Sequence, residues 1–255
     1  MPARNIDQVL ERLDYIIETS LNDQDPHGAF AALYRRVTAA VKDGIAVGQF
    51  DDGPRMERLD VVFANRYLDA WEARKAGKPV TEAWASVFET AGQGRKLLLQ
   101  HLLLGMNAHI NLDLGVAAAT VCPGAAITGL HDDFNRINDL LAQMVDTVQD
   151  NLRSVSPLLG IVDWLGKDKD ERFAGFSLKT TRTLAWIAAT SLAALESETE
   201  RNAKIDNLDQ KVASIGKGIA TPPGFFGWVI KLILFFENKD VRKQIGAVKD
   251  TMIAI

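Results

Sequence analysis

The sequence predicts an all-α protein, a single-domain multi-helix bundle built around a buried central helix at about residues 95–121. Apolar residues recur at three- and four-residue spacing along almost the whole chain of 255 residues, which is the pattern of amphipathic helices. No stretch shows the sustained alternation, the β-branched enrichment or the Asn-Gly turns that are typical of sheets. The breaks between the periodic segments are too short to be linkers, which favours one helical domain over residues 1–255.

Proline and glycine residues mark where the periodic segments stop. These residues are Pro26, Gly53, Pro54, Gly77, Pro123, Gly124, Pro157, Pro222, Pro223 and Gly224. Between them we expect helices at residues 5–20, 28–46, 54–77, 80–92, 95–121, 131–153, 170–197, 200–216, 224–237 and 239–254.

Composition narrows the classes of function. The chain has 29 Lys plus Arg against 33 Asp plus Glu, a net charge of -4, and no basic stripe of the kind that nucleic acid requires. Its single cysteine, Cys122, allows no intrachain disulfide and no cysteine-based zinc cluster. The first residues, MPARNIDQVLERLD, carry charges throughout, unlike a secretory signal peptide. We therefore expect a cytoplasmic protein that does not bind nucleic acid.

An apolar run lies near the carboxyl terminus. Residues 225–236, FFGWVIKLILFF, span about a dozen positions and include Lys231, whereas a transmembrane helix needs about twenty apolar residues. The run therefore does not predict a membrane span. It is either a helix buried against the bundle or an exposed interfacial or partner-binding helix, for example in a homo-oligomer.

The central helix combines an apolar surface with buried polar groups. Between Lys96 and Asp132 the only charged side chain is Asp113, and a helix that is apolar around most of its circumference lies inside a protein. This helix nevertheless carries the polar residues His101, Asn107, His109, Asn111 and Asp113. Each buried polar group costs about 1–3 kcal/mol unless it has a partner, so these side chains need partners.

The spacing places several of these groups on one helical face. His101, Gly105, His109 and Asp113 are each four residues apart and form a ladder. Glycine is unfavourable within a helix, so Gly105 indicates that another helix or a ligand approaches the backbone there. Asn107 and Asn111 lie on a different face and are expected to hold neighbouring helices in register.

Two arginines occupy positions where an apolar residue is expected. Arg66 shares a face with Leu59 and Phe63, and Arg182 shares one with Ala185 and Ala189. Arginine keeps its charge when it is buried, so each needs a carboxylate or an anionic ligand. Asp113 is the obvious carboxylate.

The helix after the Pro123-Gly124 turn also directs polar residues inward. We expect Asp132 or Asp133 to cap it. Asn138 lies within its core-facing stripe, with His131 and Asn135 on the flank. An antiparallel return of the chain would bring His131 near Asp113.

These residues allow several interpretations. They form a satisfied interior hydrogen-bond network, or they hold one divalent metal ion through His109 and Asp113 with His101 or His131 as a further ligand. An HD-type metal phosphohydrolase would use His101 or His109, then the dyad His131-Asp132, then Asp163 or Asp206. The dyad is a short motif that recurs by chance.

A pocket for a small polar or anionic ligand is the other functional interpretation. Arg66 and Arg182 would supply charge, and Asn135 and Asn138 hydrogen bonds. If the protein is an enzyme, we expect a hydrolase in which His109 is the general base or a ligand and Asp113 orients it. A third class is a non-catalytic scaffold or interaction protein. His27, beside a proline in a loop, is expected to be solvated, and Cys122 to be inert packing.

One stretch resembles a known family. LLLGMNAHINLDLG at 102–115, followed by DFNRIN at 133–138, is similar to the hallmark of a bacterial and fungal family of all-helical proteins, domain of unknown function family 5995. A weaker similarity, FANRYLDAW at 63–71, lies outside this hallmark. The resemblance implies a single helical domain and brings no assigned activity, cofactor or catalytic residue.

Overall fold

The computed structural model describes residues 1–89, 96–158 and 178–249, and in these ranges it contains helices and no β-strand, which confirms the predicted all-α class. The helices are α1 (Ile6–Asp23), α2 (Gly28–Ala46), α3 (Gly53–Lys75), α4 (Glu82–Phe88), α5 (Leu98–Ala108), η2 (His109–Leu114), α6 (Gly115–Val121), η3 (Gly124–Leu130), α7 (His131–Val155), α10 (Leu178–Ala193), α11 (Glu198–Ala220), α12 (Gly224–Phe236) and α13 (Val241–Lys249).

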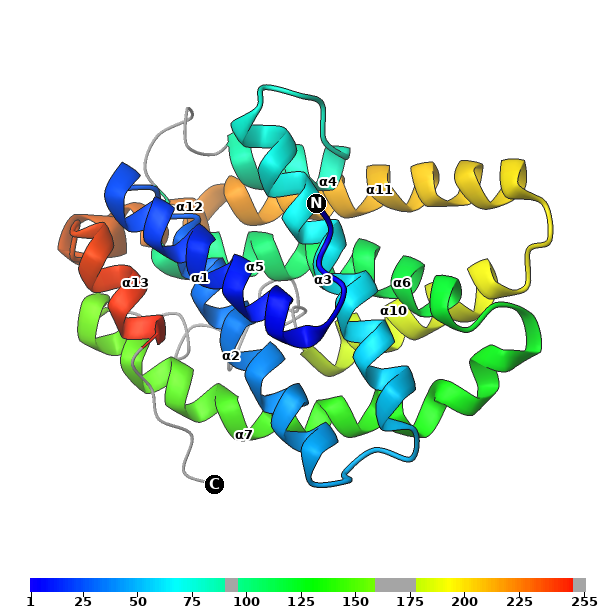
Figure 1. Ribbon diagram of the computed structural model, residues 1–255. Coiled ribbons are helices and arrows are strands. Elements are labelled where there is room, and N and C mark those ends of the chain that lie inside the picture. The colour runs from blue at the N-terminus through cyan, green and yellow to red at the C-terminus, as the bar shows by residue number, and fades with distance from the viewer. Residues whose placement is uncertain (90–95, 159–177, 250–255) are drawn as a thin grey trace.

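The expected central helix forms, but it is not uniform. It consists of α5, a π-helical segment η2 and α6, which follow one another without a break from Leu98 to Val121. In Figure 1 this rod runs through the middle of the molecule, and it contacts α2, α3, α10 and α11. Almost every side chain along it is buried. The prediction of a buried central helix is therefore confirmed.

The other boundaries differ from prediction in a few places. The structure has a 3-10 helix, η3, before α7, and α11 continues to Ala220 instead of residue 216. The predicted ends at 90–92, 170–177 and 250–254 lie outside the described residues.

Side-chain caps explain where several helices begin. Asn5, Asp52, Thr81 and Ser197 each accept a hydrogen bond from the backbone N–H three residues later, at the starts of α1, α3, α4 and α11. Such a cap satisfies one of the amide groups that the first turn leaves unpaired.

The prediction that Asp132 or Asp133 caps α7 is wrong. Its N-cap residue is Leu130, without a side-chain hydrogen bond, because α7 continues directly from η3. Asp133 is instead fully buried, and it accepts hydrogen bonds from the amides of Asp51 and Asp52 and from the guanidinium groups of Arg55 and Arg136. This carboxylate ties the loop between α2 and α3 to α7.

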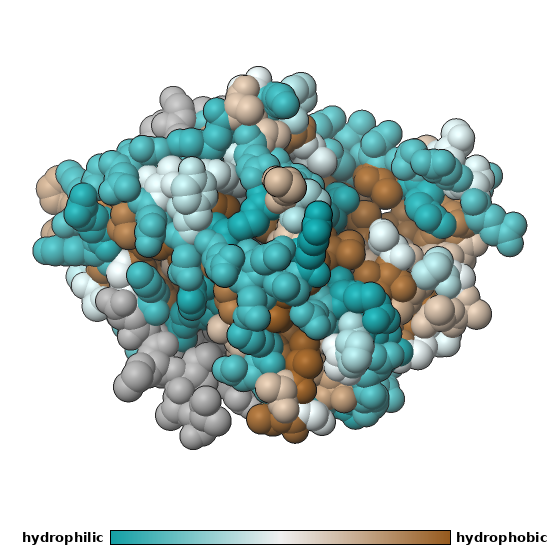
Figure 2. Space-filling view, in the orientation of Figure 1, coloured by the Kyte–Doolittle hydropathy of each residue, from teal (hydrophilic) through white to brown (hydrophobic). Residues whose placement is uncertain are grey.

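Some of the described helices are long and apolar enough to cross a bilayer. The central segment Leu98–Val121 is one, but 83% of its most apolar window is buried inside the protein. The pair of α11 and α12 also passes on length and composition when taken together, with a bend of 61° between the two helices. Hydrophilic side chains cover most of the face seen in Figure 2, and apolar ones show between them in narrow strips.

Gly105 marks a close helix contact, as its sequence position indicated. A Cβ atom at this position would lie 2.4 Å from Cδ2 of Phe30 on α2. The approaching group is therefore a neighbouring helix, and the ring of Phe30 fills the space beside the backbone.

We expect Gly105→Ala to lower the free energy of unfolding by about 1–3 kcal/mol, because its methyl group overlaps the Phe30 ring. Gly218→Ala is the matched control: Gly218 is an exposed residue of α11, and no neighbouring atom lies within 4 Å of the place that the added methyl group would take. Its substitution should be neutral or stabilising by up to about 1 kcal/mol. Urea denaturation measures both, and equal stability of the two variants would contradict the proposed contact.

Candidate functional site

The carboxylate of Asp113 lies at the centre of the site and accepts hydrogen bonds from three helices. Its Oδ1 atom accepts from Nε of Arg66 at 2.7 Å, and its Oδ2 atom accepts from the indole Nε1 of Trp84 at 2.9 Å. Nδ1 of His109 lies 3.0 Å from the same Oδ2. Asp113 is only 1% exposed, so these donors replace water around the charge. Of the two arginines expected to need this carboxylate, Arg66 is the one that pairs with it.

Burial and the neighbouring charges determine the protonation states of Asp113 and His109. Burial alone would raise the pKa of Asp113, but the charge of Arg66 and the hydrogen bonds from His109 and Arg66 outweigh it, so the pKa lies below its usual value. Burial lowers the pKa of His109, which is neutral at pH 7. Since an ionised carboxylate only accepts, the His109 proton is on Nδ1. Its buried Nε2 then carries a lone pair and has no hydrogen-bond partner among the described residues.

Both residues belong to the π-helical segment. The six residues of η2 begin at His109 and end one residue after Asp113. A π-helical turn widens the helix, and such turns are frequent at functional sites. The four-residue spacing of the pair is visible in the sequence, but the change of helix type carries no signal there.

Aromatic rings hold the imidazole in place. The ring of Phe63 stacks on His109, with 3.6 Å between centroids and 7° between planes, and the Tyr34 ring meets it edge-on at 4.5 Å. The rings of Phe30, Tyr67 and Trp84 lie around them.

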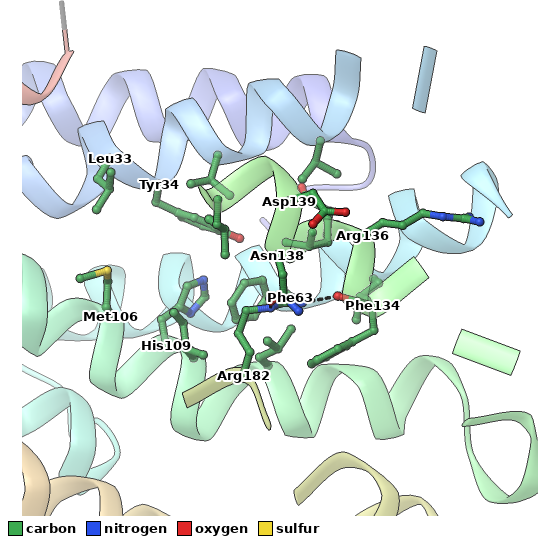
Figure 3. A pocket seen from close by; sticks show the side chains of 18 of the residues that line it. Leu33, Tyr34, Phe63, Met106, His109, Phe134, Arg136, Asn138, Asp139 and Arg182 are labelled. Carbon is green, nitrogen blue, oxygen red and sulfur yellow. Dashed lines mark hydrogen bonds between the residues drawn. The ribbon is translucent and has the colours of Figure 1, made fainter. Parts of the chain in front are cut away.

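A cavity of about 930 Å³ opens beside His109, between α2, α3, the central rod, α7 and α10. Figure 3 shows His109, Tyr34 and Phe63 on one part of its wall and Asn138, Arg136 and Arg182 on another. Most of the remaining wall is apolar. Its apolar lining includes Leu33, Val37, Val41, Met56, Leu59, Leu99, Leu102, Leu103, Met106, Ile110, Leu114, Ile137, Leu141, Val148 and Leu152.

Three uncharged polar groups face this apolar space. Oδ2 of Asp60, the hydroxyl of Tyr34 and Nε2 of His109 are all buried without a hydrogen-bond partner in the described part of the chain. Burial, with a smaller contribution from the charge of Glu57, raises the pKa of Asp60 to about 8. Burial and the Asp60 charge raise the pKa of Tyr34 well above its usual value. The two side chains are therefore mainly protonated at pH 7.

Two arginines line the described wall, and Arg182 is the one that has no carboxylate partner there; the exposed residues Asp132 and Asp139 also line the wall. Arg182 is 5% exposed. Its Nε donates a hydrogen bond to Oδ1 of Asn138, and its Nη2 donates one to the carbonyl of Phe134. Its guanidinium carbon lies 4.4 Å from the centroid of the Phe134 ring. None of the described carboxylates forms an ion pair with it. Burial lowers its pKa to about 9. Asn138 thus lies at the cavity, where it accepts a hydrogen bond from Arg182.

Of the four residues expected to bind a metal ion, His109 and Asp113 lie together, but His101 and His131 do not join them. The ring of His101 lies 5.2 Å from that of His27, and the side chain of His131 is half exposed beside Trp186. No three or more His, Cys, Asp or Glu side chains are grouped to hold a metal within residues 1–89, 96–158 and 178–249.

The HD-type arrangement does not form among the described residues either. His131 pairs with Asp132 at the surface, and Asp206 is exposed on α11. Asp163 lies outside the described residues. Asn135, expected to bind the ligand, lines the cavity but is exposed, and its side-chain nitrogen lies 3.1 Å from a ring nitrogen of His131.

The expectation that His27 is solvated is wrong. It is 3% exposed, its Nδ1 lies 2.5 Å from Oδ1 of Asp25, and its Nε2 lies 3.0 Å from the carbonyl of Val87. His101 packs against it, and burial together with the nearby His27 lowers the pKa of His101 to about 3. The two rings form a structural contact between α2, α4 and α5.

The family model of a family of unknown function, DUF5995, matches residues 6–222. The chain belongs to this family. No curated protein and no solved structure matches the chain. The matched residues include the whole of the cavity wall described above and end before α12.

Other buried polar groups of this DUF5995 protein are structural. Nδ2 of Asn107 donates to the carbonyl of Val212 on α11, and Nδ2 of Asn111 donates to Oδ1 of Asn107, both at 2.9 Å. The pair thus holds two helices in register, as predicted. Burial raises the pKa of the Cys122 thiol, which disfavours the reactive thiolate.

Sequence reasoning missed two residues of the site, Tyr34 and Asp60. A signal for Asp60 existed: it lies four residues after Met56 and four before Ala64, both buried. Like Arg66, Asp60 is therefore a polar residue on an apolar helical face. Tyr34 gave no such signal, because tyrosine is common in helical cores.

We expect Asp113→Asn to lower the free energy of unfolding by about 3 kcal/mol at pH 7, because it leaves Arg66 without its partner. The folded-state pKa of Asp113 is depressed, so its contribution is present above the unfolded value of about 3.9 and is lost as pH falls. The difference between variant and wild type should therefore shrink below pH 4.

Urea denaturation between pH 3 and pH 7 measures this difference. Asp132→Asn is the control, since the Asp132 side chain is 80% exposed and its loss should change stability by less than about 0.5 kcal/mol. A difference for Asp113→Asn that stays constant across this pH range would contradict the assignment.

Proposed function

We propose that this protein binds an amphipathic organic acid, with the acid group at Arg182 and the apolar body in the cavity. The observation that carries the proposal is a buried guanidinium in the wall of a large apolar cavity, without a carboxylate partner among the described residues.

The charge of Arg182 favours an anion. A buried arginine keeps its charge and is costly unless an anion compensates it. Asn138 and the Phe134 carbonyl accept hydrogen bonds from it but bring no negative charge. They orient the planar guanidinium, which can bind a carboxylate through two parallel hydrogen bonds.

The size and lining of the cavity favour an apolar body. Sites for small molecules usually measure about 300–1,000 Å³ and are mainly hydrophobic, with a few polar groups that fix orientation. The cavity of about 930 Å³ fits this description. The donor and acceptor groups of Tyr34, Asp60 and His109 would recognise a hydroxyl or carbonyl group along the ligand.

Two expectations from the sequence have no part in this proposal. Arg66 is not among the residues that line the described cavity, because its guanidinium is committed to Asp113. A divalent metal ion is not included either, because the described His and Asp side chains are not grouped to bind one. The cavity itself favours ligand binding over a pure scaffold.

We expect Arg182→Gln to weaken the binding of cis-parinaric acid, a fluorescent long-chain acid, by about tenfold to a hundredfold, since it removes a charged hydrogen bond. Binding of the methyl ester should change by less than about threefold, because the ester carries no charge. Fluorescence titration measures both.

Two further variants make this test decisive. Arg136→Gln is the matched control, since Arg136 lines the same cavity but is paired with Asp51 and Asp133 and should leave both affinities unchanged. Met106→Trp should abolish binding of acid and ester alike by filling the space. The proposal fails if wild type binds neither probe, or if Arg182→Gln weakens both equally.

Hydrolysis is a second candidate function, favoured by the geometry of His109. Asp113 orients its imidazole, and the free Nε2 atom lies in the wall of the cavity. In an ester hydrolysis, a water molecule would give its proton to Nε2 as its oxygen attacks the acyl carbon. The bond to the leaving alcohol then breaks, and the alcohol takes that proton from the imidazolium.

We expect His109→Gln to reduce hydrolysis of para-nitrophenyl esters of long-chain acids by about 10²–10⁴-fold, the usual contribution of a general base. The pKa of His109 lies below 6.5, so the wild-type rate should be constant above pH 6.5 and fall in more acidic solution, as Nε2 becomes protonated. His101→Gln, at a second buried histidine, is the control. Release of nitrophenol no faster than in buffer would reject this candidate and leave ligand binding untouched.

A further inference from the structure

Helix α12 presents an apolar face that the described part of the chain does not cover. Val229, Ile230 and Ile233 are buried and pack with Leu97 in a small core. On the neighbouring face Phe225, Trp228, Phe235 and Phe236 are 59%, 61%, 75% and 55% exposed. Phe225 and Trp228 are three residues apart and Trp228 and Phe235 are seven apart, so these exposed aromatic side chains form a stripe along one side of the helix. A patch of this kind marks an interaction surface.

The chain segment that contains this stripe is rich in exposed basic residues. Between residues 211 and 249 the exposed charged side chains are seven basic residues and one acidic residue. They are Lys211, Lys217, Lys231, Lys239, Arg242, Lys243, Lys249 and Asp240. The other acidic residue of this segment, Glu237, is buried. The whole chain is acidic, with a net charge of -4, so positive charge is concentrated on this part of the molecule.

We propose that α12 docks on an anionic lipid surface, with its aromatic stripe at the level of the headgroups. Tryptophan and phenylalanine on one face of a helix, with lysine beside them, are the features of helices that lie in the membrane interface. Lysine and arginine near such a surface are attracted to anionic lipids. The helix lies along the surface, because its 13 residues, including Lys231, are too few to span the bilayer.

The charge also argues against a second copy of the chain as the occupant. Two stripes packed face to face would bring two sets of basic residues together, and like charges across an interface disfavour association. An anionic surface instead compensates them. Lipid docking does not depend on the proposed ligand, since α12 contributes no residue to the described cavity wall.

The test is sedimentation of the full chain with vesicles. We expect binding to vesicles of equal parts phosphatidylcholine and phosphatidylserine, and at least tenfold weaker binding to phosphatidylcholine alone. The double variant Trp228→Glu with Phe235→Glu should abolish binding. Lys231→Gln with Lys239→Gln should weaken it by about fivefold for each lysine removed.

A matched variant separates the stripe from apolar exposure in general. Leu184 and Ile187 on α10 are 51% and 56% exposed, so Leu184→Glu with Ile187→Glu should leave vesicle binding unchanged. Circular dichroism and urea denaturation verify that each variant is folded.

Three results would overturn the inference. They are no sedimentation with either vesicle, equal binding to both vesicles, and a doubled mass in solution that Trp228→Glu with Phe235→Glu reduces to the monomer. The last would identify α12 as a contact between two copies of the chain.

Discussion

The burial of a single carboxylate, Asp113, is the constraint on which the centre of this protein depends. Its side chain is almost fully buried, so water cannot compensate the charge. Arg66 reaches it from α3, Trp84 from α4 and His109 from its own helix. Each donor comes from a different element, so satisfying this one charge fixes how α3 and α4 lie against the central rod.

The same arrangement leaves one side of His109 open to the cavity. Asp113 accepts a hydrogen bond from Nδ1–H, so the proton stays on Nδ1 and Nε2 is an acceptor; the stacked Phe63 ring prevents the imidazole from turning to find another partner. Tyr34 and Asp60 are held nearby with atoms that lack a partner among the described residues. Buried groups without partners cost stability, and proteins concentrate them at sites of function. These unpartnered groups at one cavity wall are an observation that supports the proposed binding site.

Much of the fold and part of the candidate site could be predicted from the sequence. The rest depends on three-dimensional packing, which residue spacing does not determine. Helical periodicity and the single charge in residues 97–131 predicted the central rod, and the rule that a buried arginine needs an anion predicted that Arg66 or Arg182 would pair with Asp113. Spacing could not show that His131 faces solvent, since that depends on how η3 turns the chain. It also could not show which arginine would find Asp113 and which would be left at a cavity.

Arg66 and Arg182 looked alike in the sequence but have different roles in the structure. Both arginines occupied positions on apolar faces, but Arg66 meets a carboxylate and holds the fold, whereas Arg182 meets only uncharged acceptors among the described residues. The charge of Arg66 is compensated without a ligand, whereas the charge of Arg182 is not. The family match covers Arg182 and the rest of the cavity wall but ends before α12. If both proposals hold, a family member that keeps the cavity residues and lacks the aromatic stripe would retain ligand binding and lose attachment to lipid.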